Sequence, residues 1–337
     1  METLTPNLGG RDIVMISDYV DDYDDEDIKE EEIFLQAIRK QVEEDGSKFY
    51  FIEVKTLKEL DEKLSVFNPE TIIVFNWCEE VFGKPNSGHV ITRYLEDNRF
   101  VFTGADTETL KLNQNKVSVK RILVENGVST PKYFIVEKDS TAEIPDDFEF
   151  PLIVKTTGEH GSLGITDSSV VKDHKHLDKQ IEFIHKNFGQ DAMVEEFIDG
   201  PEYLASVWGN NKLEMLPVME IDYSKIGDKE HKLQNYDSKW DKSSNDFNVV
   251  KIKLPEDLTK AVTILIEENV LKTFKATKCR TYARIELRVK DGIPYIIDVN
   301  ANPSFLPHVS FLESAKLAGY NYGRTVEKIC EFALNSK

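Results

Sequence analysis

The sequence predicts an amino-terminal α/β unit built on a parallel, doubly wound sheet, followed by an α+β region that completes the 337 residues. Two observations lead to this fold class. Strand-like apolar runs at 11–17, 49–54 and 71–77 alternate with helical patterns, which is typical of a parallel sheet with crossover helices. Later strand-like runs follow one another more closely, and Asp291-Gly292 separates the last two, which indicates an antiparallel hairpin.

The amino-terminal unit is expected to form a first domain over residues 1–112. Its first helix follows the acidic segment 18–32, and Gly46 is expected to end this helix. The stretch 57–67 is an amphipathic helix. The apolar residues at helical spacing in the first helix are Ile33, Phe34, Ala37, Ile38 and Val42.

The α+β region divides into two further expected domains. Residues 113–199 are predicted to form a small lobe, and residues 200–337 a larger one. The small lobe combines strands at 132–137, 150–157 and 192–198 with two helices, one within 113–131 that ends at Gly127 and one near 175–188. The larger lobe contains several strands, a long helix over 256–276, a hairpin of 281–289 and 293–299, and two final helices.

Composition narrows the possible partners and location. A net charge of −19 argues against nonspecific nucleic-acid binding, which needs a basic surface. The start lacks the basic and apolar segments of a secretory signal, and no run of eighteen apolar residues predicts a membrane span. Three cysteines, Cys78, Cys279 and Cys330, fit no metal or redox spacing. We therefore expect a reducing, cytoplasmic location, with no nucleic-acid or membrane partner.

The predicted hairpin carries a cluster of polar residues. Glu286 and Asp298 lie on its two strands at similar distances from the turn, with Arg284 and Asn300 nearby. Carboxylate and amide oxygens suit Mg²⁺, and an arginine beside them could stabilise a phosphoryl group or an oxyanion. The alternative is a solvent-exposed strand face with ordinary charges. Because the other faces of these strands are apolar, and buried charges are usually paired or bound to metal, the set favours a metal site.

Two other motifs suggest a nucleotide site. In "PLIVKTTGEHGSLGI" (151–165), Lys155 ends an apolar strand and a glycine-rich loop follows, whose N–H groups could bind phosphate. The loop is neither a Walker A nor a Rossmann motif, and a plain hairpin is the alternative. In "MVEEFIDGPEY" (193–203), a strand end and turn could form an adenine-binding hinge, with a common turn as the alternative.

Taken in order, these motifs resemble the ATP-grasp superfamily. Within this superfamily, the chain is most similar to the D-alanine–D-alanine ligase group. The motifs that carry the similarity are Lys155 with "EHGSLGI", then "VEEFIDGPE", "ARIEL" and "IIDVNANPSF". The clear part of the resemblance covers about residues 113–337, and "VFNWCEE" (74–80) resembles a strand-end segment of ligase-like members. The resemblance implies an ATP-grasp fold preceded by a pre-ATP-grasp domain.

The resemblance also implies roles for individual residues. Arg284 would stabilise the tetrahedral centre and form a catalytic set with Ser162 and Lys239. Ser310 would join Arg284 at the substrate, with Val309 in its place if the alignment shifts by one residue. Asn302 would either touch the substrate as well or only cap the turn before Pro303. Glu286, Asp298 and Asn300 would hold two Mg²⁺ ions, with Mn²⁺ as an acceptable substitute. The implied ATP-binding residues are Lys116, Lys155, Gly161, Ser162, Gly164, Glu195, Glu196, Phe197, Ile198, Glu202 and Lys239.

The implied activity is ATP-dependent ligation of a carboxylate to an amine. Phosphoryl transfer from ATP makes an acyl phosphate, which the amine attacks, releasing ADP and phosphate. The glycine-rich loop must close to keep water from the intermediate. The implied partners are small amino-acid or peptide substrates and a second copy of the chain.

The chain departs from the group's pattern in two places. The usual glycine-rich loop with Ser and Glu after the first strand is replaced by "SDYVDDYDDEDIKEE", which favours a substrate other than D-alanine. Glu286 and Asp298 reverse the usual Asp-then-Glu order, and because one side chain lengthens while its partner shortens, this change is compatible with an intact metal site. The acidic segment 18–32 could recognise an ammonium or polycationic substrate, or simply favour a helix amino terminus. The alternative functions are a kinase acting on a small molecule, a genuine D-alanine–D-alanine ligase, and a nucleotide-binding protein without catalysis. The complete set of charged residues argues against the last.

Overall fold

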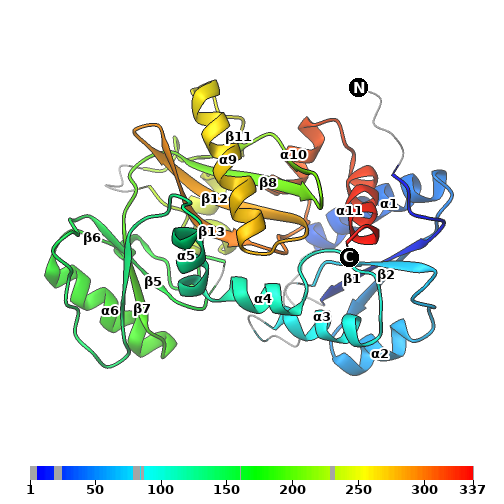
Figure 1. Cartoon of the computed structure of the whole chain (residues 1–337), viewed down its shortest axis with the longest axis horizontal. Coiled ribbons are helices and arrows are strands. Elements are labelled where there is room, and N and C mark those ends of the chain that lie inside the picture. The colour runs from blue at the N-terminus through cyan, green and yellow to red at the C-terminus, as the bar shows by residue number, and fades with distance from the viewer. Residues whose placement is uncertain are drawn as a thin grey trace.

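The computed structural model describes residues 6–18, 25–78, 84, 87–159, 161–227 and 232–336. The predicted amino-terminal α/β unit is present, with its strands in the order β2-β1-β3 and all parallel. Figure 1 shows β1 and β2 of this unit side by side. Helix α1 begins inside the acidic segment and ends before Gly46, as the sequence indicates. The elements of this part are β1 (Asp12–Asp18), α1 (Asp25–Glu44), β2 (Phe49–Val54), α2 (Leu57–Leu64) and β3 (Ile72–Asn76).

Two helices that the periodicity did not predict join this unit to the next. They are α3 (Gly88–Asp97) and α4 (Thr107–Gln114). The carboxylate of Asp106 caps α4 by accepting a hydrogen bond from the Thr109 N–H at 2.8 Å. The chain then enters α5 (Lys116–Glu125), which Asn115 caps in the same way.

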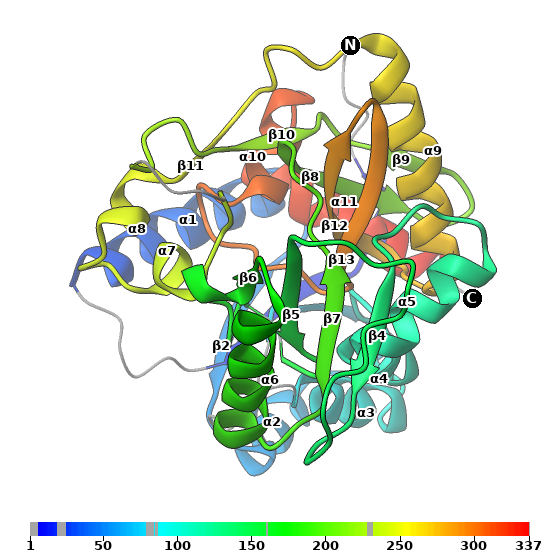
Figure 2. The ribbon, with the colours of Figure 1, turned by 90° about the vertical axis from the view of Figure 1, so that its left-hand side faces the viewer.

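The small lobe is a four-stranded antiparallel sheet in the order β4-β7-β5-β6, with α6 packed on one face (Figure 2). Helix α6 is well bounded, because Asp173 caps its start and Gly189 takes the left-handed conformation, with a φ of 65°, at its end. The elements of the lobe are β4 (Tyr133–Val136), β5 (Leu152–Thr156), the 3₁₀ turn η1 (Asp167–Ser169), β6 (Val170–Val171), α6 (His174–Phe188) and β7 (Ala192–Glu196).

The larger lobe is a six-stranded antiparallel sheet in the order β11-β10-β8-β12-β13, with β9 paired to β8. Asp291 and Gly292 both have positive φ, 52° and 77°, so they form the tight turn that their sequence predicts. Helix α9 packs against this sheet (Figure 1). The elements are β8 (Glu202–Gly209), β9 (Leu213–Met215), β10 (Met219–Asp222), α7 (Tyr236–Trp240), α8 (Asn245–Val249), β11 (Lys251–Lys253), α9 (Lys260–Ala276), β12 (Thr281–Lys290) and β13 (Ile293–Asn300).

The two final helices, α10 (Ser310–Leu317) and α11 (Tyr322–Leu334), return to the amino-terminal unit. Figure 1 shows α11 beside α1, and Phe34 on α1 stacks edge-on against Tyr322 with ring centroids 5.0 Å apart. One apolar core therefore contains residues from both ends of the sequence. The domain boundaries at residues 112 and 199 stay a prediction. Within the described ranges, no helix has the length and apolar character needed to cross a bilayer.

Candidate active site

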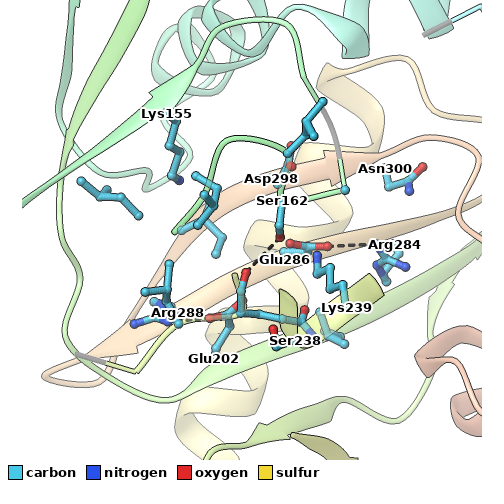
Figure 3. Close-up of a pocket in the computed structure, with 18 of the residues that line it drawn as sticks. Lys155, Ser162, Glu202, Ser238, Lys239, Arg284, Glu286, Arg288, Asp298 and Asn300 are labelled. Atoms are coloured by element: carbon cyan, nitrogen blue, oxygen red, sulfur yellow. Dashed lines mark hydrogen bonds and ion pairs between the residues drawn. The ribbon is translucent and has the colours of Figure 1, made fainter. Parts of the chain in front are cut away.

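A cavity of about 450 Å³ lies between the small lobe and the β12–β13 hairpin (Figure 3). Its walls come from β5 and the loop after it, the β7–β8 connection, α7, the hairpin and the start of α10. All the predicted site residues line this cavity except Gly164 and Asn302. The structure thus brings together residues that are up to about two hundred positions apart in the sequence.

The hairpin places Glu286 directly opposite Asp298, and Arg284 directly opposite Asn300. This pairing depends on a β-bulge, because the register shifts by one residue between Glu286 and Leu287. In a regular hairpin from the same turn, Glu286 would face Ile297, and Asp298 would point to the opposite side of the sheet. The extra residue on β13 thus brings both carboxylates to the cavity side.

Each carboxylate of this pair contacts a cation. Lys116 Nζ lies 2.9 Å from Asp298 Oδ2, and Arg284 Nη2 lies 2.9 Å from Glu286 Oε1. Burial acts to raise the pKa of Glu286, but Lys239 and then Arg284 outweigh it and leave this pKa below its usual value. Glu286 is therefore ionised at neutral pH, as a ligand for a hard cation must be.

The donor set fits magnesium bound together with a nucleotide. Among the described residues, no three His, Cys, Asp or Glu side chains are grouped to hold a metal by themselves. Two carboxylates and the Asn300 amide leave further coordination positions for water and phosphate oxygens, which is the arrangement that Mg²⁺ prefers.

A buried chain of charges runs inward from Lys155 on the cavity wall. Lys155 Nζ is 2.7 Å from Glu195 Oε2, and Lys120 Nζ is 2.9 Å from Glu195 Oε1. Burial acts to raise the pKa of Glu195, but Lys120 and Lys155 outweigh it and leave this pKa lowered. Burial lowers the pKa of Lys120 to about 8. Lys120 was not among the predicted site residues, because a single lysine in an amphipathic helix is typical of a surface position.

The glycine-rich loop is tied down at both its start and its tip. Gly158 donates its N–H to Gln190 Oε1 at 3.0 Å, while Ser162 donates its hydroxyl to the Gln234 carbonyl at 2.9 Å. The indole N–H of Trp240 donates to the Gly161 carbonyl at 2.7 Å. The loop is therefore held over the cavity by the segment that contains α7.

Backbone conformation explains the small residues in this loop. Gly161, Ser162 and Gly164 all have positive φ, at 65°, 64° and 80°. A side chain at Gly164 would meet Phe188 and Thr156 at 3.1–3.2 Å. Gly164 thus shapes the loop from behind and does not line the cavity.

Glu196, Phe197 and Ile198 line the predicted hinge end of the cavity. Glu202 also lines it, and its Oε2 pairs with Arg288 Nη2 at 2.6 Å and accepts a hydrogen bond from the Tyr223 hydroxyl at 2.9 Å. Arg288 was not predicted. It continues the alternation of Arg284 and Glu286 along β12, and that spacing of two residues was the available signal.

The far end of the cavity is formed by the segment before α10. Both Ser310 and Val309 line it, so the structure accommodates either predicted alignment. Asn302 lies elsewhere: its Oδ1 accepts a hydrogen bond from the Tyr282 hydroxyl at 2.9 Å, and its Nδ2 donates to the Cys78 carbonyl at 3.2 Å. The lining residues in this segment that the sequence did not single out are Ser304, Leu306 and His308.

The amino-terminal side of the site is described only in part. The acidic segment 18–32 and the stretch 74–80 extend outside the described residues, at 19–24 and 79–80. Asp27, on α1, forms an ion pair with Lys242 at 2.7 Å, which connects this helix to the segment that follows α7.

Comparisons with known proteins identify the family. The family described as D-ala D-ala ligase C-terminus matches residues 122–331, which is more than half of the chain. The chain belongs to the D-alanine–D-alanine ligase family. An uncharacterized protein of Sinorhizobium fredii is 30% identical to it, over 77% of this chain and 74% of that protein. The D-alanine–D-alanine ligase of Moorella thermoacetica is 27% identical, over 84% of this chain and 88% of that enzyme.

Solved structures confirm the ATP-grasp fold of this family. The D-alanine–D-alanine ligase of Bacillus anthracis, complexed with ATP, aligns with a TM-score of 0.72 at 21% identity, over 96% of this chain and 98% of that one. The VanG D-Ala:D-Ser ligase of Enterococcus faecalis aligns with a TM-score of 0.70 at 19% identity, over 96% of this chain and 99% of that one. This family member is an ATP-dependent ligase.

Proposed function

We propose that this ligase joins the carboxylate of one small amino-acid or peptide substrate to the amine of another, through an acyl phosphate, at the cavity described above. The observation that carries the proposal is the pairing of Glu286 with Asp298 on one cavity wall, between the lysines of the small lobe and the start of α10. This order along the cavity is what transfer from a nucleotide to a neighbouring substrate requires.

The nucleotide is assigned to the end between the hinge and the lysines. Glu196, Phe197 and Ile198 would border the base, and Glu202 the ribose. In this structure Glu202 pairs with Arg288, which would fix its carboxylate in place. Lys155, Lys116 and Lys239 line the adjoining region, where their charges would bind the phosphates.

Glu286, Asp298 and Asn300 would hold magnesium beside these phosphates. When bound, magnesium would neutralise phosphate charge and orient the terminal phosphoryl group. We propose two ions, with Mn²⁺ as a substitute, because Glu286 and Asp298 each bring a carboxylate to the same wall of the cavity.

The reaction then has two stages. A carboxylate oxygen of the first substrate attacks the γ-phosphorus of ATP, the bond to the β-phosphate oxygen breaks, and ADP leaves. The amine of the second substrate attacks the acyl carbon, and phosphate leaves with one of the original carboxylate oxygens while the nitrogen loses a proton. Arg284 lies at the cavity wall opposite Asn300, where its guanidinium would stabilise negative charge on the acyl centre.

The glycine-rich loop would protect the acyl phosphate from water. Ser162 and Trp240 hold this loop against the α7 segment, and both line the cavity. Lys239 directly precedes Trp240, so the same short helix would contribute a phosphate-binding lysine and a contact that closes the loop.

We propose that the substrates differ from a pair of D-alanines. The chain lacks the glycine-rich Ser/Glu loop of the group after β1, and it carries Leu306, His308 and Val309 at the far end of the cavity. The names of several relatives keep genuine D-alanine–D-alanine ligation as the second candidate. Kinase activity has no comparable support.

A substrate screen tests this proposal. Purified protein with Mg²⁺-ATP and pairs of amino acids or dipeptides should release ADP and phosphate and form an amide that mass spectrometry detects. Hydroxylamine added with the acid substrate alone should trap a hydroxamate. A stable phosphorylated product without any amide would instead support the kinase, and a preference for D-alanine pairs would support the second candidate.

Location and assembly remain proposals as well. We propose a cytoplasmic enzyme, because Cys78, Cys279 and Cys330 are all buried and free, as a reducing compartment favours. We also propose a homodimer, which size-exclusion chromatography with light scattering would test directly.

A further inference from the structure

Lys120 is a buried cation just behind the cavity wall. It lies on α5, its side chain is 2% exposed, and its ammonium contacts three other segments of the chain. Nζ is 2.9 Å from Glu195 Oε1 on β7, 2.7 Å from Thr130 Oγ1, and 3.3 Å from the Ile296 carbonyl on β13. Burying a lysine is costly unless its charge is compensated, so this arrangement requires an explanation.

Glu195 connects Lys120 to the cavity. Its side chain is 1% exposed, and its two oxygens are divided between two lysines, with Oε1 next to Lys120 and Oε2 next to Lys155. Lys155 and Glu195 both line the cavity, but Lys155 is 15% exposed and Glu195 only 1%, so Lys155 is the more accessible of the two to a ligand. The order is therefore Lys120 inside, Glu195 between, and Lys155 at the wall.

A purely structural role would not need this charge at Glu195. A neutral donor could bridge the Thr130 hydroxyl and the Ile296 carbonyl and still tie α5 to β13. Removing the Lys120 charge would leave Glu195 Oε1 buried without its cation, which is strongly unfavourable. The carboxylate would then take up a proton or turn both oxygens toward Lys155, and either change would move the Lys155 ammonium.

We propose that Lys120 is a positioning residue for the nucleotide phosphates. By holding the inner oxygen of Glu195, it fixes the outer oxygen against Lys155 and so keeps the Lys155 ammonium at the cavity wall. This inference rests on the proposed function for the location of the phosphates. It extends that function to a residue that does not itself reach the ligand.

Binding measurements with two ligands test this role. Isothermal titration calorimetry would compare the Mg²⁺ complex of a non-hydrolysable ATP analogue with adenosine, which lacks phosphates. In Lys120→Met, the analogue's Kd should rise about tenfold, the order expected when one charged contact is weakened, while the Kd of adenosine stays unchanged. In a Lys155→Met background, Lys120→Met should cause no further loss, because its effect passes through Lys155.

A matched control lies one residue away. Arg121 is on the same helix with its side chain 69% exposed, so Arg121→Met should change neither Kd. If Lys120→Met does not fold, as judged by circular dichroism, Lys120→Gln provides the same test, because its amide can still donate to the Ile296 carbonyl.

Three results would overturn the positioning role: equal losses for both ligands, no loss for either, or full additivity with Lys155→Met. A fall in melting temperature without selective loss of the analogue would indicate that Lys120 only supports the fold. Failure of the wild-type protein to bind the analogue would instead contradict the proposed function, so the two failures are distinguishable.

Discussion

Glu286 and Asp298 are directly opposed across β12 and β13, although the turn that joins these strands would place them on opposite faces in a regular hairpin. The bulge at β13 is therefore a precondition of the site. It sits beside the cavity, where bulges commonly redirect side chains toward functional sites.

Neutralising one member of this pair should impair catalysis without unfolding the protein. Asp298→Asn keeps the side chain's shape and removes its charge, so we expect turnover to fall by about a hundredfold or more. Steady-state ADP release would measure the effect. Asp291→Asn in the exposed turn is the matched control, because asparagine also tolerates its positive φ and turnover should not change. Full activity of Asp298→Asn would refute the magnesium assignment.

Substitution of Arg284 should reduce amide formation much more than it reduces nucleotide binding. Its guanidinium pairs with Glu286 and lies next to the proposed acyl centre, so Arg284→Ala should retain affinity for an ATP analogue within a few-fold while amide formation falls by about a hundredfold or more. Calorimetry and product analysis by mass spectrometry would measure the two effects. A large loss of analogue affinity would place Arg284 on the nucleotide instead.

Trp240 should control access of water to the intermediate. Trp240→Ala removes the hydrogen bond to the Gly161 carbonyl, so ATP hydrolysis per amide formed should rise several-fold. Trp240→Phe keeps an aromatic ring but lacks the indole N–H, and should show an intermediate effect. The ratio of phosphate released to amide formed measures this unproductive hydrolysis. An unchanged ratio in both variants would contradict the proposed role of Trp240 in excluding water.

Intrinsic fluorescence offers an independent view of the same contact. Trp77 and Trp208 are 5% and 0% exposed, whereas Trp240 is 57% exposed. Ligand-induced changes in tryptophan emission should therefore come mainly from Trp240. Addition of an ATP analogue should shift the emission of the wild type, and this shift should disappear in Trp240→Phe. Persistence of the shift would mean that the loop contact does not respond to the nucleotide.

Stability should decrease with rising pH because of Glu327, which is buried between α11 and α1. Burial, followed by the charge of Asp45, raises the pKa of Glu327 from 4.5 to about 8. Between these values the folded state binds more protons than the unfolded state, so the free energy of unfolding should fall as pH rises through this window. Glu327→Gln should flatten that dependence, measured by denaturant unfolding at several pH values. Glu331→Gln on the same helix is the control, and an unchanged slope in Glu327→Gln would contradict the assignment.

The sequence predicted the site better than it predicted the geometry that assembles it. The Asp291-Gly292 turn and the alternation of Arg284 and Glu286 identified the hairpin and its charged face. No residue in "PYIIDV" marks Ile297 as an extra residue, because a bulge depends on pairing with the neighbouring strand and not on local propensity.

Two of the elements that were missed have a weak local signal. Helices α7 and α8 are five residues each within a polar stretch, which is too short for a helical period to appear. The family resemblance identified Lys239 but gave no reason to single out Trp240, the next residue, which contacts a loop far away in the sequence. Asn302 was expected either at the substrate or as a cap of the turn before Pro303; it lies beyond the end of β13, and its side chain hydrogen-bonds Tyr282 and the Cys78 carbonyl.

Transfer of an isotope label tests the central claim most directly. An acid substrate identified by the screen would be prepared with ¹⁸O in its carboxylate and turned over with Mg²⁺-ATP and the amine. If the enzyme forms an acyl phosphate, one ¹⁸O atom should appear in the inorganic phosphate for each amide made. Amide formation with unlabelled phosphate would contradict the acyl-phosphate mechanism that the proposed function depends on.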